Sequence, residues 1–141
     1  MFNWFNKKKI NQPDGIAIQQ SALHGRGVFA CKTFKTGAIV ETAPVILLQK
    51  EERDFLQGTS LFNYYFLIAD KTTSVALCLG YSSLYNHTYS ANALYSISLK
   101  EKTITIKACK NINIGDEITL NYNGSPNDAT AVYFAPEVTT A

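Results

Sequence analysis

The sequence has little charge of either sign. Only 17% of its 141 residues are Asp, Glu, Lys or Arg, whereas about a quarter is usual in globular domains. Thirteen Lys and Arg against eleven Asp and Glu leave a net charge of +2, so we predict no direct nucleic-acid partner. A hydrophobic fraction of 46% argues against disorder, and the length corresponds to one domain.

Cysteine and histidine are also scarce, with three and two residues. Cys31, Cys78 and Cys109 are too widely spaced for a zinc motif, and their odd number does not fit a disulfide framework. We therefore predict no metal site and reduced thiols, which are typical of intracellular proteins. This predicts a cytoplasmic protein, or a nuclear one if the source is eukaryotic.

Long apolar runs are missing as well. The longest, residues 43–48, is far below the ~18 residues of a membrane span, and no apolar signal region follows the N-terminus. We expect residues 1–14 to form a flexible tail that ends at the turn signal Pro13–Gly15. The aromatic residues beside Lys7–Lys9 leave contact with a membrane surface as the alternative, but we predict no membrane partner.

What is present is a series of short β-strand patterns. The clearest is Thr103–Ala108, in which apolar and polar residues alternate as in a half-buried hairpin arm. Because proline cannot donate to a β-ladder, Pro44 predicts that Ile39–Leu48 is broken or at a sheet edge. Residues 50–56 predict a short helix, and further strand patterns cover residues 16–19, 62–68, 74–79, 94–99 and 118–122. The sum is a mostly β domain with little helix.

Three segments do not fit an ordinary β-sandwich: His24–Phe29, Gly80–Asn92 and Gly115–Gly124. Each alone has an ordinary interpretation. The first is a turn with two glycines, the second is a network of satisfied polar groups, and the third is a strand that ends in an Asn-Gly turn. With only two histidines in the chain, His87 by itself does not indicate a metal ligand.

Together, in this order and spacing, the segments resemble the signature of the SET-domain protein lysine methyltransferases. Gly25-Arg26-Gly27 matches the GxG of that family, and Leu84–Asn92 matches its Asn-His motif in frame. Gly115–Tyr122 matches the motif G-(E/D)-E-(L/I)-T-x-x-Y throughout, and Asn63–Phe66 resembles the Y-x-F strand. The resemblance spans residues 15–124, which we take as the SET domain.

The chain departs from the family pattern within the Asn-His motif. Thr88, Tyr89 and Ala91 stand where the family usually has Ser, Cys and Pro. The cysteine-rich segments that flank many eukaryotic members are missing, so their zinc sites are not expected. The chain is therefore similar to the minimal form of the domain, of the kind found in bacteria and large viruses.

The resemblance implies a β-clip SET fold with a knot-like core, which would bring Asn86 and His87 beside Tyr122. It implies methyl transfer from S-adenosyl-L-methionine to the side-chain amine of a lysine in a protein substrate. Tyr122 would be the catalytic residue. The residues that would bind the donor are Gly25, Arg26, Gly27, Asn86 and His87. Those that would line the lysine channel are Tyr64, Phe66, Leu120 and Tyr122.

Several expectations depend on this resemblance. Leu120 lacks the hydroxyl of a tyrosine, so we hypothesise that more than one methyl group can be added. We also hypothesise that the C-terminal segment 125–141 closes the active site through Tyr133 or Phe134; the alternatives are an edge cover or a subunit contact. A homodimer stays open, and so does the choice among histone, histone-like and other lysine-rich substrates. The alternative function is a SET-fold interaction module without turnover.

Overall fold

The structure is a computed structural model, and it describes residues 10, 12–68 and 74–132. Short strands dominate this part of the chain, as predicted, and helix is limited to one α-helix and two short 3-10 helices. In chain order the elements are β1 (Ile16–Gln20), β2 (Arg26–Ala30), β3 (Ile39–Leu48), α1 (Lys50–Leu56), η1 (Ser60–Asn63), β4 (Tyr65–Leu67), β5 (Val75–Cys78), η2 (Ser82–Leu84), β6 (Asn86–His87), β7 (Ala93–Ser98), β8 (Thr103–Ala108) and β9 (Glu117–Leu120).

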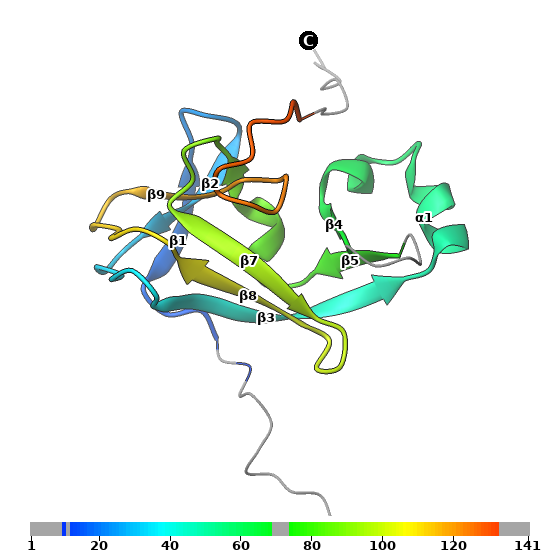
Figure 1. The fold of residues 1–141 in the computed structure, drawn as a ribbon, viewed down its shortest axis with the longest axis horizontal. Coiled ribbons are helices and arrows are strands. Elements are labelled where there is room, and N and C mark those ends of the chain that lie inside the picture. The colour runs from blue at the N-terminus through cyan, green and yellow to red at the C-terminus, as the bar shows by residue number, and fades with distance from the viewer. Residues whose placement is uncertain (1–9, 11, 69–73, 133–141) are drawn as a thin grey trace, which may run out of the picture.

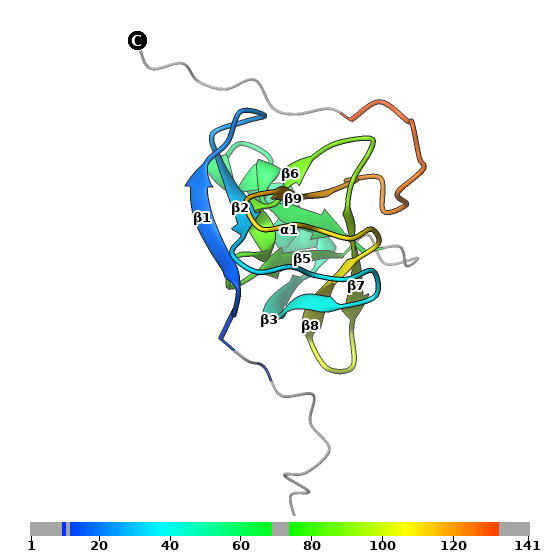
Figure 2. The same ribbon diagram turned by 90° about the vertical axis from the view of Figure 1, so that its left-hand side faces the viewer.

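The strands form two sheets, one ordered β1-β2-β9-β6 and the other β4-β5-β3-β8-β7. Figure 1 shows β4, β5 and α1 at one end of the molecule and β1, β2 and β9 at the other, with β3 and the β7–β8 hairpin between them. The view in Figure 2 places β6 and β9 side by side, which agrees with their parallel pairing. A single hydrophobic core joins the two sheets.

The β7–β8 hairpin confirms the clearest prediction from the sequence. Its strands pair antiparallel from Ala93 with Ala108 to Ser98 with Thr103. Ile104, Ile106 and Ala108 are buried on one face, because alternate residues of a strand point to opposite sides of the sheet. The hairpin therefore supplies one wall of the core.

Pro44 does not place β3 at a sheet edge, because β3 is the central strand of the five-stranded sheet. The strand instead changes partners at this point. It pairs with β8 from Ile39 to Pro44 and with β5 from Val45 to Leu48. The prediction that this stretch is broken or lies at an edge was wrong, because β3 runs continuously from Ile39 to Leu48, and Pro44 lies where its partner changes.

The predicted helix over residues 50–56 is confirmed as α1. The strand predicted over residues 62–68 is shorter than expected, because its first residues belong to η1. The Thr59 hydroxyl accepts a hydrogen bond from the backbone N–H of Leu61 at 3.3 Å, and this local bond favours a helical turn over the ladder. The strand begins only at Tyr65, so Tyr64 lies at the junction of η1 and β4.

Candidate active site

Asn86 joins the three unusual segments of the sequence. Its Nδ2 group lies 2.9 Å from the carbonyl oxygen of His24, 3.1 Å from that of Arg26 and 2.8 Å from the Glu117 Oε1 atom. All three are acceptors, and Asn86 is only 7% exposed. The amide therefore holds a cluster of oxygens contributed by the turn before β2 and by the start of β9.

Gly27 leaves the space that this cluster needs. A Cβ atom at this position would overlap the Glu117 carboxylate and would lie 3.1 Å from the Asn86 Nδ2 atom. The Ser21 hydroxyl lies 2.9 and 2.8 Å from the two Glu117 oxygens, which fixes the carboxylate in place. Glu117 was not among the predicted site residues. Its place inside the third unusual segment is the signal that could have identified it.

The second and third unusual segments are held together by backbone and side-chain bonds. Asn86 and His87 of β6 pair in parallel with Thr119 and Leu120 of β9. The Asn92 side chain donates to the Glu117 carbonyl and accepts from the Thr119 N–H, both at 2.9 Å. These bonds fix β9, and they thereby fix the chain that leads from Leu120 to Tyr122.

His87 contacts Tyr122 directly. The Nδ1 atom of His87 accepts a hydrogen bond from the backbone N–H of Tyr122 at 3.1 Å, and the two ring centroids are 5.2 Å apart. Burial lowers the pKa of His87, because desolvation disfavours the charged imidazolium. The ring is therefore neutral at neutral pH, as an accepting Nδ1 requires.

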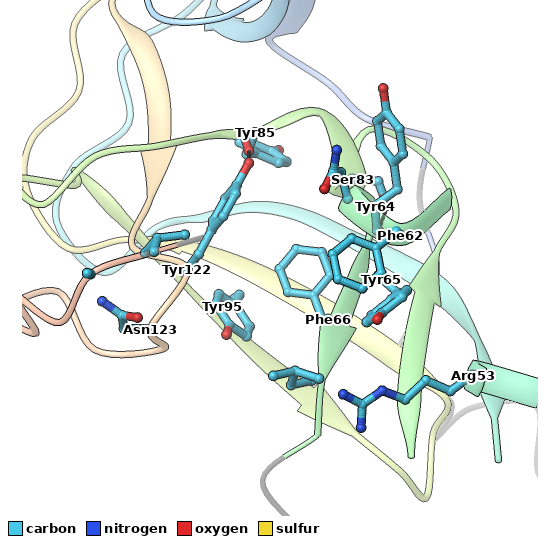
Figure 3. Close-up of a pocket in the computed structure, with 14 residues that line it drawn as sticks. Arg53, Phe62, Tyr64, Tyr65, Phe66, Ser83, Tyr85, Tyr95, Tyr122 and Asn123 are labelled. Carbon is cyan, nitrogen blue, oxygen red and sulfur yellow. Dashed lines mark hydrogen bonds between the residues drawn. The ribbon is translucent and has the colours of Figure 1, made fainter. Parts of the chain in front are cut away.

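Tyr122 directs its hydroxyl back into the protein. The hydroxyl donates to the backbone carbonyl of Tyr85 at 2.6 Å (Figure 3). Burial raises the pKa of Tyr122 to about 12, so the hydroxyl stays protonated at neutral pH. A phenol oxygen can accept a hydrogen bond as well as donate one.

A cavity of about 320 Å³ opens beside this hydroxyl. Figure 3 shows Phe66 and Tyr95 next to Tyr122, with Arg53 on the far side. The rings of Phe66 and Tyr95 meet edge to face with centroids 4.8 Å apart. Half of the lining residues are aromatic. The lining consists of Arg53, Phe62, Asn63, Tyr64, Tyr65, Phe66, Leu67, Ser83, Tyr85, Tyr95, Tyr122, Asn123, Ala131 and Val132.

Comparison with known proteins decides what this arrangement is. The family model of the SET domain matches residues 25–123, which is most of the chain. The chain belongs to the SET-domain family. The match begins at the first glycine of the GxG segment and ends one residue after Tyr122, so it contains Asn86, Arg26 and Glu117 of the oxygen cluster and most of the cavity lining.

Relatives of this SET domain are named for lysine methylation. A Schizosaccharomyces pombe histone-lysine N-methyltransferase, H3 lysine-37 specific, is 27% identical over 76% of this chain and 72% of its own length. Human histone-lysine N-methyltransferase 2B is 26% identical over 89% of this chain, which spans only 5% of that protein. A solved structure of a Plasmodium falciparum protein, described as a candidate histone methyltransferase, has a TM-score of 0.65 at 31% identity and covers 82% of this chain and 97% of its own. The predicted family, mostly β SET fold and protein-lysine methyltransferase activity are confirmed.

The structure brings together most of the residues predicted for the site. Tyr64, Phe66 and Tyr122 line the cavity, whereas Gly25, Arg26, Gly27, Asn86 and His87 belong to the neighbouring SET-domain motifs. Leu120 does not line the cavity, because its side chain is fully buried in the core below Tyr122. Tyr133 and Phe134 lie outside the described residues. Tyr85 and Tyr95 also line the cavity but were not predicted as site residues, because in the sequence they resemble ordinary aromatic residues of a strand or motif.

Two further observations concern metals and membranes. Among the described residues, no group of three or more His, Cys, Asp or Glu side chains could hold a metal ion. In the same part of the chain, no helix is long and apolar enough to cross a bilayer.

Proposed function

We propose that this SET-domain methyltransferase uses S-adenosyl-L-methionine as its donor and Tyr122 as its catalytic residue. The observation that carries the proposal is the Tyr122 hydroxyl, which is fixed by the Tyr85 carbonyl at the wall of an aromatic cavity. The carbonyl that accepts this hydroxyl belongs to Tyr85, which lines the cavity and directly precedes Asn86 in the chain. This arrangement suits a reaction in which two reactants approach one point from different sides.

The oxygen cluster around Asn86 fits the amino-acid end of the donor. An ammonium group needs several acceptors, and the carbonyls of His24 and Arg26 together with the Glu117 carboxylate supply them. Gly27 lets the Glu117 carboxylate approach the backbone there, because any side chain would overlap it. We assign donor binding to Gly25, Arg26, Gly27, Asn86 and His87. When bound, S-adenosyl-L-methionine supplies an electrophilic methyl group on its sulfonium sulfur.

The cavity fits the side chain of a lysine. Aromatic walls such as Tyr64, Phe66 and Tyr95 exclude water, which lowers the pKa of an amine and favours the neutral nucleophile. The same faces attract an ammonium cation before it loses its proton. At the Tyr122 end, the hydroxyl oxygen accepts a hydrogen bond from the amine and sets its direction. Alignment is the main requirement of an in-line displacement.

The C-terminal segment contributes to the cavity. The Asn121 and Asn123 amides each donate at 2.7 Å, to the carbonyls of Asp128 and Thr130 respectively. These bonds turn the chain back, so that Ala131 and Val132 line the cavity. We propose that segment 125–141 closes the active site and that Tyr133 or Phe134, the next residues of the chain, complete the closure.

Replacing Asn123 by Ala tests this closure. We expect the KM for the protein substrate to rise about tenfold, which corresponds to about 1.4 kcal/mol. The free energy of unfolding should fall by only about 1 kcal/mol, because one short hydrogen bond to Thr130 and one long one, at 3.4 Å, to Asp128 are lost at a partly exposed site. Steady-state kinetics and urea denaturation measure the two effects. Asn127→Ala, an exposed change in the same segment, serves as the matched control.

Deletion of residues 129–141 is a second test of this closure. Unchanged donor affinity after the deletion would argue against closure of the donor side.

The substrate class follows from the relatives and from chemistry. The named relatives act on histones, and we propose a histone, histone-like or other lysine-rich protein as the substrate here. Incubation with methyl-labelled donor and purified core histones, and separately with a cell lysate, tests this. Label should appear on lysine. Donor binding by calorimetry without transfer to any protein would instead favour the alternative function, an interaction module without turnover.

A homodimer and an intracellular location stay predictions, as does the absence of nucleic-acid, membrane and metal partners.

We also propose that more than one methyl group can be added. Leu120, two residues before Tyr122, is buried away from the cavity, so this position presents no hydroxyl that could restrain a partly methylated amine. Mass spectrometry of a modified peptide after exhaustive turnover should show dimethyl-lysine or trimethyl-lysine. Only monomethyl-lysine at that point would contradict the proposal.

A further inference from the structure

Glu41 is a buried carboxylate that none of the family motifs contains. It lies on β3 and is only 3% exposed, although burying an ionised group is costly unless it is well hydrogen-bonded. Burial raises the pKa of Glu41, and the hydrogen bonds from Tyr81 and Tyr85 act in the opposite direction. The desolvation of Glu41 costs folding free energy, which raises the question of what the side chain contributes in the core.

Both oxygens of Glu41 accept hydrogen bonds from one short segment. Oε1 accepts the backbone N–H of Tyr81, and Oε2 accepts the hydroxyl of Tyr85, both at 2.9 Å. Gly80 makes room for this contact, because a Cβ atom there would lie 2.6 Å from Oε1, and its φ of +70° favours glycine. Glu41 therefore ties down the segment 80–85 at both of its ends.

Tyr85 is the link from this carboxylate to the reaction site. The residue is 1% exposed, its hydroxyl is held by Glu41, and its backbone carbonyl accepts the Tyr122 hydroxyl at 2.6 Å. Figure 3 shows the Tyr122 hydroxyl directed at Tyr85. Any rotation of the Tyr85 peptide that moved its carbonyl would also strain the bond between its ring and Glu41.

We infer that Glu41 is a positioning residue for methyl transfer: it fixes Tyr85, whose carbonyl sets the direction of the Tyr122 hydroxyl. The catalytic consequence rests on the proposed role of Tyr122. The alternative is that Glu41 only stabilises the fold. The two differ in a testable way, because a purely structural carboxylate would change the stability without changing the environment of the Tyr122 hydroxyl.

Two variants remove the same link from opposite ends. Glu41→Gln keeps an oxygen for the Tyr81 N–H but offers an NH₂ group to the Tyr85 hydroxyl, whereas Tyr85→Phe removes only that hydroxyl and leaves the carbonyl in place. We expect each to lower kcat about tenfold, since small misplacements of reacting groups are costly, with KM for donor and protein changed less than twofold. The double variant should be no worse than Tyr85→Phe alone.

A spectroscopic readout separates this inference from the activity itself. In protein labelled with ¹³C at the tyrosine Cζ position, the Tyr122 resonance should shift in Glu41→Gln and in Tyr85→Phe. It should not shift in Glu101→Gln, the same chemical change in the exposed β7–β8 turn. If the wild type transferred no methyl groups, the proposed function would fail, and the resonance would still test the positioning. Wild-type kcat and an unshifted Tyr122 resonance in both variants would overturn the inference, even if their stability fell.

Discussion

Tyr122→Phe is expected to reduce kcat for methyl transfer by about 10²- to 10³-fold, the usual loss when one preorganised hydroxyl or amide is removed from a reaction site. The hydroxyl donates to the Tyr85 carbonyl at 2.6 Å and has no substitute in phenylalanine. Donor affinity should stay within about threefold of wild type, because the Asn86 cluster is untouched. Labelled-methyl transfer and calorimetry measure the two quantities.

Tyr81→Phe is the matched control for this experiment. Tyr81 packs against the core and does not line the cavity, so loss of its hydroxyl should leave kcat unchanged. Tyr122→Phe should also lose about 1 kcal/mol of unfolding free energy, because one hydrogen bond is removed. Retained activity in Tyr122→Phe would refute the catalytic role of the hydroxyl. A loss of donor affinity as large as the loss of kcat would point to a binding role instead.

Asn86→Asp should abolish donor binding at neutral pH and destabilise the fold by about 3 kcal/mol. The substitution replaces only the side-chain NH₂ group by an oxygen. A hydrogen-bond donor thereby becomes a carboxylate that faces two carbonyls and the Glu117 carboxylate, which the Asn86 amide of the wild type contacts at 2.8 Å. Like charges at this distance raise the pKa of the new aspartate. Its repulsion is therefore present at neutral pH and is relieved as the pH falls through that raised value.

The unfolding free energy of Asn86→Asp should accordingly increase, relative to wild type, as the pH falls through the raised pKa toward the ordinary aspartate pKa of about 3.9, because in that range the folded state binds more protons than the unfolded state. Urea denaturation at several pH values measures this. Asn111→Asp is the control: Asn111 acts as an acceptor for the Thr36 N–H at 2.9 Å, so an aspartate keeps the bond. Equal behaviour of the two variants would show that Asn86 is not the donor at the centre of the cluster.

Local pattern alone was sufficient for several elements. The alternation in Thr103–Ala108 specifies a strand with one buried face, and the charged run at residues 50–56 specifies a short helix. It was insufficient at η1, where one threonine hydroxyl changed the start of a strand, and at Pro44, where the partner switch depends on strands far away in the sequence. Strand pairing depends on residues that are distant in the sequence. The effect of a proline on its own strand can therefore be predicted locally, but the position of that strand in the sheet cannot.

The site shows the same division. The motifs around Gly25–Gly27, Asn86–His87 and Tyr122 can be recognised in the sequence alone, because the chemistry expected of the family calls for those residue types at those positions. Tyr85 and Tyr95 are not distinguishable from other aromatics until the fold turns them toward one cavity. Leu120 shows the converse: its neighbour Tyr122 suggested a channel position, but packing buries it in the core.

By itself the sequence determined the family and the mostly β class, because these depend on residue type, spacing and the period of two, and it predicted which motif residues form the site. Only the tertiary structure decided which acceptors surround Asn86, where Tyr122 points and which groups hold Glu41 in the core. Each of these is a contact between residues separated by 31 to 62 positions in the chain. Such contacts arise from strand pairing and packing, which local sequence does not encode.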